Sequence, residues 1–524
     1  MPISQHRAPS IPFWCNFLLI CCVLALAACS DRNDDAARNA ALAQEALGRN
    51  DLPAAREAIA AAIDDRDDVV EYHLLRGRIE RAAGSDGAAF TAYNDALSLD
   101  ATNGEALLNV AQLGLSTGHL RESLDATEHV LSLAPDNIDA LLLRGIHGMI
   151  RRNYSEAIEY GDKILALSPG HEGGTILKSR ALFMTRKPDE ALKTLEGITG
   201  AAVDSEAAAL TRLEIYRALR HSEQLGSEFE HLRKLRPTDL ALRTDEANFR
   251  FKIGDRRLAH ELVASVLASP QVNRQGAELA LALWDEYGSQ DVPQALLERI
   301  DRGGSAAARQ ALARFQIRHD RPAQASATLS TLAGAEGAGL RARYLMLTGK
   351  GPEALELAKS VLEQDTTDCD ALIAASEGTL TQRNAADAVR YAQQASAECP
   401  TQPGGWLASA RAYQALGRES GVNRVYGQAL DANKQSSELT AAYTRWLVSE
   451  GRSREALAMA RRLTRYAPAL ASGWRLYDDL CRRFDTSCLD ESRQGLADAS
   501  TMFGVDLDPG ASPPNGLFGR LVER

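Results

Sequence analysis

One dipeptide and one acidic cluster carry residue types that serve catalysis or metal binding in other proteins. His171-Glu172 begins like the H-E-x-x-H helix of zinc proteases, in which two histidines hold the metal and the glutamate is the general base. Here the sequence continues Gly173-Gly174-Thr175, so the second histidine is missing. The acidic run over 64–68 lacks the ligand spacing of a calcium loop.

No other catalytic motif is found in the sequence. It contains neither a phosphate-binding GxxxxGK(S/T) or GxGxxG loop nor a GxSxG nucleophile elbow. We therefore predict that the chain is not an enzyme and has no catalytic residues, no metal site and no cofactor.

Cysteine is the remaining residue type with chemistry to offer, because thiols accept lipids and form disulfides. Of the 8 cysteines, three fall within an apolar N-terminal stretch, one ends that stretch and four lie in the last third of the chain. In that order they are Cys15, Cys21, Cys22, Cys29, Cys369, Cys399, Cys481 and Cys488. All pairings of the last four thiols are possible from sequence alone.

The apolar stretch at the N-terminus has the character of an export signal. Residues 11–28 are apolar apart from Asn16 and follow a weakly basic start. The stretch is also just long enough for a membrane-spanning helix, which is the alternative.

Leu26-Ala27-Ala28-Cys29 resembles the lipobox of bacterial lipoproteins. That resemblance implies cleavage of the signal peptide 1–28 and lipidation of Cys29, whose acyl chains would anchor the protein to a membrane. Ser30 in place of aspartate suggests the outer membrane. We expect the chain to face the periplasm, an oxidising compartment.

Composition narrows the class of the remaining chain. Of 524 residues, 45% are hydrophobic but only 6% are aromatic, and alanine and leucine favour helices over strands. The net charge of −11 gives no basic field to attract phosphates, so we predict no nucleic-acid partner.

The body of the chain repeats itself every 34 residues. Leu97, Leu131 and Leu165 keep this spacing within similar Leu-x-Leu segments, and Trp406 and Trp474 lie two periods apart. Small residues recur in the same way, as do turn glycines. The recurring residues are Ala55, Ala89, Ala157, Ala191, Ala354, Ala388, Ala456, Gly84, Gly118, Gly417 and Gly451.

This pattern resembles the tetratricopeptide repeat, in which each unit is a hairpin of two amphipathic helices. The resemblance implies an all-α, right-handed superhelical solenoid of such hairpins with a short C-terminal capping helix. Trp406 and Trp474 are then expected to pack in the core. We expect a signal peptide (1–28), a lipidated tether (29–35), about seven repeats (36–273), degenerate helical repeats (274–334), a second repeat block with its capping helix (335–503) and a Gly/Pro-rich tail (504–524).

The repeat frame suggests a pairing for the four late cysteines. Cys369 begins the first helix of one repeat and Cys399 ends the second, so the hairpin brings them together. Cys481 and Cys488 flank the turn of the last, degenerate unit. We infer the disulfides Cys369–Cys399 and Cys481–Cys488, with buried free thiols as the alternative.

In the family, partners bind the concave face formed by the first helices. We expect an apolar groove there for an amphipathic or extended peptide, although some of its residues could pack into the neighbouring helix instead. The expected groove residues are Leu108, Leu115, Leu142, Ile146, Met149, Ile176, Phe183 and Met184.

Residues at equivalent positions of successive repeats stand side by side and form a column along the stack. The groove residues form such columns, and another column consists of arginines, whose guanidinium groups bind carboxylates well. Its members are Arg78, Arg180, Arg411 and Arg445, and ordinary solvated surface is the alternative. Two functions follow from these columns. The first is a lipid-anchored scaffold that binds partner proteins, for exopolysaccharide export or for pilus or outer-membrane assembly. The second is a module that binds an acidic polysaccharide.

Overall fold

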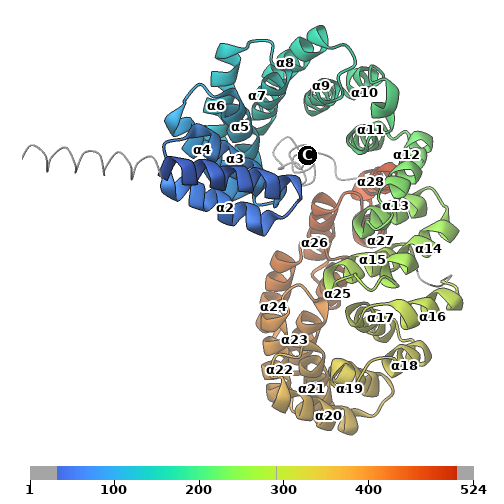
Figure 1. Ribbon diagram of the computed structural model, residues 1–524. Coiled ribbons are helices and arrows are strands. Elements are labelled where there is room, and N and C mark those ends of the chain that lie inside the picture. Colours follow the sequence, from blue (N-terminus) through green and yellow to red (C-terminus); the bar gives the residue numbers. More distant parts are fainter. Residues whose placement is uncertain (1–31, 289, 291, 504–524) are drawn as a thin grey trace, which may run out of the picture. The chain divides into compact units, whose positions relative to one another are not determined.

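The computed structural model describes residues 32–288, 290 and 292–503, which form two compact units divided between residues 215 and 216. We call them the N-terminal unit and the C-terminal unit. All regular structure in these residues is helical (Figure 1). The signal peptide, Cys29 and the tail 504–524 lie outside the described residues.

The N-terminal unit is a series of helix hairpins, and its last helix runs through the boundary at residue 215. Its helices are 32–48, α2 (Leu52–Asp65), α3 (Val70–Ala82), α4 (Asp86–Leu99), α5 (Gly104–Thr117), α6 (Leu120–Leu133), α7 (Ile138–Ile150), α8 (Tyr154–Leu167), α9 (Glu172–Met184), α10 (Pro188–Leu195), η1 (Gly200–Asp204) and α11 (Glu206–Leu219). The first of these helices begins at residue 32, within the stretch 29–35 that the sequence predicted as the lipidated tether.

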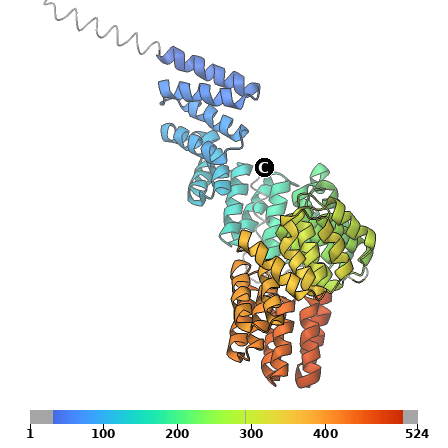
Figure 2. The same cartoon turned by 90° about the horizontal axis from the view of Figure 1, so that it is seen from below.

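The C-terminal unit continues the hairpins. Its helices are α12 (Ser222–Leu235), α13 (Leu240–Lys252), α14 (Arg256–Leu267), α15 (Arg274–Tyr287), α16 (Gln294–Gly303), α17 (Ala306–Arg318), α18 (Pro322–Ser330), η2 (Ala335–Gly337), α19 (Ala338–Leu347), α20 (Gly351–Gln364), α21 (Cys369–Thr381), α22 (Ala385–Glu398), α23 (Pro403–Ala415), α24 (Glu419–Ala432), α25 (Ser437–Ser449), α26 (Ser453–Tyr466), α27 (Ala471–Phe484), η3 (Thr486–Cys488) and α28 (Leu489–Thr501). Figure 2 shows the orange-to-red helices of this unit side by side.

The 34-residue period sets where the helices begin. The odd-numbered helices from α3 to α15 are the first helices of their hairpins, and each begins 34 residues after the previous one. The helix starts are capped at the same period: the side chains of Asn103, Asn137, Asp239 and Asn273 each accept a backbone N–H from the first turn. The turn between the two helices of each hairpin, from α3–α4 to α25–α26, contains a left-handed residue, which Gly84 and Gly118 supply at no steric cost in the first two.

Small residues at the helix crossings let the hairpins pack closely. Ala55, Ala89, Ala157 and Ala191 are fully buried, as are their counterparts Ala354, Ala388 and Ala456. Leucine and isoleucine fill the space between hairpins, so the stack needs few aromatic residues. Trp406 and Trp474 pack against the core of α23–α27, and their indole N–H groups donate to the carbonyls of Pro400 and Pro468.

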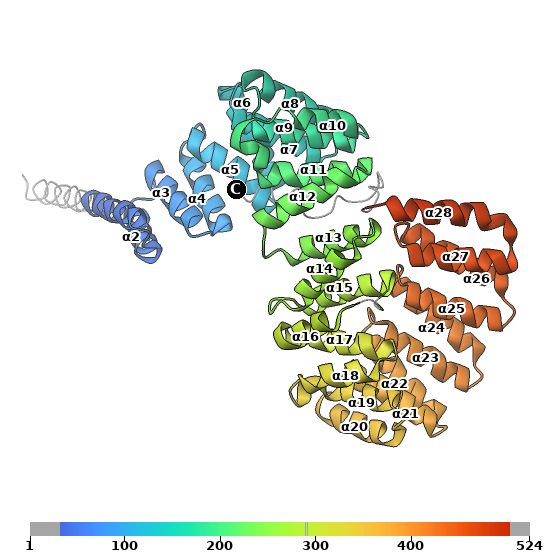
Figure 3. The same cartoon turned by 90° about the vertical axis from the view of Figure 1, so that its right-hand side faces the viewer.

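The C-terminal unit doubles back on itself. In Figure 3, α13–α20 run along one side and α21–α28 return along the other. The repeat shortens just before this return. The first helices α15, α17, α19 and α21 begin only 32, 32 and 31 residues apart, and the second helices α16 and α18 are short. No described helix is long and apolar enough to cross a membrane.

A buried histidine in the N-terminal unit gives a first prediction. The Ser123 hydroxyl donates to the Ala111 carbonyl at 2.5 Å and lies 2.9 Å from His147 Nε2, so that nitrogen is the one that carries the proton. Burial, together with Arg151 and Arg144, lowers the pKa of His147 from 6.5 to about 4. The unfolded chain therefore binds a proton in this pH range before the folded chain does.

We expect the free energy of unfolding to fall as the pH drops from 6.5 to 4. His147→Asn should flatten this dependence, as measured by urea unfolding at a series of pH values. The matched control is His129→Asn on α6, where the side chain is half-exposed rather than buried. An equal flattening in both variants would contradict the assignment to His147.

Candidate functional site

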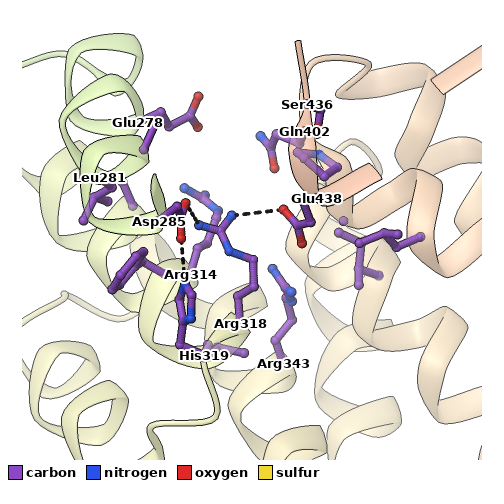
Figure 4. Close-up of a pocket in the computed structure, with 18 of the residues that line it drawn as sticks. Glu278, Leu281, Asp285, Arg314, Arg318, His319, Arg343, Gln402, Ser436 and Glu438 are labelled. Atoms are coloured by element: carbon purple, nitrogen blue, oxygen red, sulfur yellow. Dashed lines mark hydrogen bonds and ion pairs between the residues drawn. The ribbon is translucent and has the colours of Figure 1, made fainter. Parts of the chain in front are cut away.

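A pocket of 1040 Å³ lies on the inner face of the C-terminal unit (Figure 4). The first helices α15, α17, α19, α21 and α23 line it, together with residues at the starts of α25 and α27. The period explains this, because equivalent positions of successive first helices stand side by side along the stack. The second helices of these hairpins contribute no lining residue.

Charged side chains of both signs meet in the pocket. Asp285 on α15 accepts a hydrogen bond from Arg318 at 2.5 Å, and its other oxygen lies 2.6 Å from His319 Nε2. Arg318 also reaches to the opposite side of the pocket, where its Nη1 lies 3.6 Å from Glu438 Oε2 on α25 (Figure 4). Burial raises the pKa of Glu438, and Arg318 opposes that effect.

A buried carboxylate supports two more arginines of the pocket. Asp370 on α21 accepts hydrogen bonds from Arg314 Nε at 2.7 Å and from Arg343 Nη1 at 3.0 Å. Burial alone would raise the pKa of Asp370, but the two guanidinium groups hold it below its ordinary value. Asp370 therefore stays charged and fixes both arginines in place.

Apolar side chains separate these ion pairs. Leu281, Phe315, Met346, Ile373 and Leu407 contribute to the wall, and Met346 and Leu407 are only half-buried. The pocket thus offers apolar contacts and paired charges of both signs. Such a surface can bind a ligand that is itself amphipathic and carries both kinds of charge.

The pocket lies next to a polar seam that joins the two sides of the C-terminal unit. The side chains of the seam are Lys252, Glu286 and Arg318 on the α13–α17 side, and Glu438 and Arg475 on the other side. Glu286 accepts the backbone N–H of Ser472 at 2.9 Å, and Arg475 lies 3.6 Å from the same carboxylate.

Lys252 is the member of the seam with the most hydrogen bonds across it. Its ammonium group donates to the carbonyls of Ala469, Ala499 and Met502 at 2.7–3.0 Å, and two of these belong to the C-terminal end of α28. A cation at this end of a helix is favourable, because the terminal carbonyls lack partners within the helix. Burial nevertheless lowers the pKa of Lys252 to about 8, although Glu286 opposes that shift.

The predicted apolar groove is partly wrong. Ile146, Met149 and Ile176 have exposed fractions of only 1–4% and pack in the interior, so they cannot contact a partner. The period places these residues on the apolar side of their helices, but that side faces the neighbouring hairpin there. The other five predicted residues are half-buried and stay a prediction: Leu108, Leu115, Leu142, Phe183 and Met184.

The predicted arginine column is wrong at Arg180, which is 4% exposed and donates to the Thr211 hydroxyl, so it cannot reach an anion in the groove. Arg78 is exposed and pairs with Glu105 through two of its nitrogens, and it stays a prediction. Arg445 is exposed on α25, while Arg411 lines the pocket and pairs with Glu377 at 2.5 Å.

Arg314, Arg318 and Arg343 were not predicted from the sequence, because they lie where the 34-residue spacing is lost. Aligning the first helices by their starting residues, instead of by the period, identifies Arg314. Arg314, Arg411 and Arg445 are each the ninth residue of a first helix when the helices are aligned by their starts.

The four late cysteines are paired as the repeat frame suggested. Cys369 joins Cys399 across one hairpin, with 6.4 Å between the Cα atoms, and Cys481 joins Cys488 with 5.7 Å. Each disulfide lies in the C-terminal unit, and the first contributes to a smaller cavity of 360 Å³ beside Asp370.

Comparison with known proteins identifies the repeats. Residues 40–106, 111–172 and 149–213 match the tetratricopeptide repeat family. The N-terminal unit therefore contains tetratricopeptide repeats over these residues. Such repeats form scaffolds that generally bind other proteins and are typically not catalytic. The search of curated proteins found no match.

Several solved structures are similar to parts of this chain at low identity. PilF of Pseudomonas aeruginosa is 16% identical over 40% of this chain and 96% of its own, with a TM-score of 0.33. PilW, a type IV pilus biogenesis factor, is 18% identical over 39% and 94%, with a TM-score of 0.34. A tetratricopeptide repeat protein from Parabacteroides merdae is 18% identical over 56% and 99%, with a TM-score of 0.31.

The buried carboxylate between two arginines gives a second prediction. Asp370→Asn leaves two guanidinium groups without their counter-charge, so we expect a loss of about 3–5 kcal/mol in the free energy of unfolding. The matched control is Asp365→Asn in the loop before α21, where the side chain is exposed and its change should cost less than about 1 kcal/mol. Urea unfolding of the two variants checks this, and equal losses would contradict the role of Asp370.

Proposed function

We propose that this chain is a scaffold of the bacterial cell envelope, anchored by a lipid on Cys29 and facing the periplasm, most simply at the outer membrane. The Leu26–Cys29 pattern supports the anchor. The two disulfides support the location, because disulfides persist in oxidising compartments outside the cytoplasm.

The partner-binding site in this proposal is the pocket of the C-terminal unit. The observation that carries it is the lining: five successive first helices present apolar side chains between paired charges of both signs. A peptide segment of a partner protein offers the same mixture, with apolar, acidic and basic side chains close together. Assembly of an exopolysaccharide-export machine, or of a pilus or outer-membrane machine, is the role that such a scaffold would serve.

An acidic polysaccharide is the second candidate ligand, and the arginines of the pocket are the observation in its favour. However, Arg314, Arg318, Arg343 and Arg411 each already contact a carboxylate of the chain. A polyanion would have to displace these carboxylates or be repelled by them. The peptide is therefore the better fit.

The anchor can be tested by metabolic labelling with an alkyne-modified fatty acid in a bacterial host. We expect the wild-type chain to be labelled and recovered with membranes. Cys29→Ser should lose the label and the membrane association, because no thiol remains for lipidation. Cys22→Ser is the control, since that residue lies in the predicted signal peptide. Labelling of Cys29→Ser at the wild-type level would refute the anchor.

The pocket can be tested by selecting peptides from a random display library on the purified full chain. Met346→Glu places a new charge on the half-buried pocket wall and should weaken selected peptides roughly tenfold or more. Met459→Glu is the control, because Met459 is equally half-buried but packs against the core outside the pocket.

Two outcomes would contradict the peptide site. One is a library that yields no peptides above background, and the other is equal weakening by both methionine variants. A polyuronate chain should bind weakly in the same assay. Tight polyuronate binding that falls steeply with salt would favour the polysaccharide instead.

A further inference from the structure

The three seam residues on the α13–α17 side occupy one repeated position. Lys252, Glu286 and Arg318 are each the thirteenth residue of a first helix. Their partners repeat as well, because Glu438 and Ser472 are each the second residue of α25 and α27. The two runs of hairpins therefore meet in antiparallel register, with the ends of one set of helices facing the starts of the other.

Outside the seam, a charge at this position is rare among the first helices that have thirteen or more residues. The thirteenth residues of the first helices α3, α5, α7, α9, α11, α21, α23 and α25 are Ala82, Ser116, Ile150, Met184, Ala218, Thr381, Ala415 and Ser449. None of them is charged. In α27 it is Arg483, which pairs with Asp479 of its own helix. A charged thirteenth residue that contacts another helix is thus confined, among these helices, to the three that form the seam.

The seam differs from the interfaces between consecutive hairpins, which are apolar. One hydrophobic cluster covers α13–α17 and a separate one covers α23–α27, and they share no residue. Across the seam, the aromatic contact between Phe249 and Phe503, with ring centroids 5.3 Å apart, accompanies the polar contacts. Ion pairs of this kind contribute little each, and one Glu286 oxygen is buried without a partner.

We propose that the seam is a clasp: α23–α28 separate reversibly from α13–α17 along it, and the opening widens the pocket for the partner segment. Helix α21 stays with α17, to which the Asp370–Arg314 pair holds it. The two hydrophobic clusters stay intact in this motion, so its cost is confined to the contacts across the seam. These are the polar contacts, including those of Arg220 with Asp498 and Thr501, and the buried aromatic contact of Phe249 with Phe503. A partner that binds the open form better would shift the population toward it. The opening itself is independent of the proposed function, whereas the widening for a partner rests on it.

Hydrogen exchange gives a direct measurement, because the Ser472 amide proton is held by Glu286 across the seam. We compare the full chain with a seam variant, Lys252→Met combined with Glu286→Gln and Arg318→Met. The matched control changes the same residue types on exposed faces of second helices: Lys359→Met, Glu298→Gln and Arg302→Met.

We expect exchange in the segment around Ser472 and in α28 to become roughly tenfold faster in the seam variant, with α21–α24 unchanged. High salt should shift the wild type in the same direction, which tests the clasp without any substitution that could impair folding. The clasp is refuted if neither the seam variant nor salt changes this exchange, if the control variant changes it equally, or if α21–α24 exchange faster to the same extent.

Peptides selected on the wild type separate the two proposals. Tighter binding to the seam variant than to the control supports a clasp that limits access to the pocket. Equal binding to both, with faster exchange in the seam variant, overturns the widening and leaves the proposed function standing. Failure to obtain any pocket-dependent peptide overturns the proposed function, while the exchange experiment still decides whether the seam opens.

Discussion

The structure depends on the fact that a single helix hairpin cannot bury its own apolar side. Each hairpin must stack on the next, and the fully buried alanines at the crossings set how closely it does so. Stacking at a fixed period then brings equivalent side chains of successive hairpins into columns. The pocket lining, the helix caps and the seam are all columns of this kind, so they follow from the same constraint.

The columns of equivalent side chains form a pocket and a seam only where the stack of hairpins turns back on itself. Through α15 the first helices begin at a constant interval, and over the next three hairpins the interval shortens. Within the C-terminal unit this brings helices from opposite ends of the run face to face. Charges that would be solvated on an open stack, such as Arg318 and Glu438, then lie within reach of each other. Bringing these charges together removes water from them. This desolvation lowers the pKa of Lys252 and raises the pKa of Glu438.

The helix hairpins could be predicted from the sequence, but the contacts between residues far apart along the chain could not. Periodic leucines, alanines and glycines predicted the hairpins, because helix phase and turn geometry depend on neighbouring residues. The same period could not tell a concave surface from a contact with the next hairpin, and so it placed the buried Met149 and Ile176 in a groove. Arg314 and Arg343 were missed since they flank a shortened repeat, where a strict 34-residue comparison fails.

The seam could not be predicted from the sequence for a different reason. The residues that contact each other across it are far apart along the chain. Lys252 and Met502 are separated by 250 residues, and no periodicity indicates that their hairpins meet. Once the helices are aligned by their starts, however, the charged thirteenth residues of α13, α15 and α17 differ from the uncharged residues at that position in eight other first helices. The remaining charge, Arg483 of α27, pairs within its own helix. A charge at a helix end can bind the groups of a second helix terminus that faces it, as Lys252 binds the carbonyls at the end of α28. The charges at the ends of α13, α15 and α17 therefore lie where this stack contacts itself.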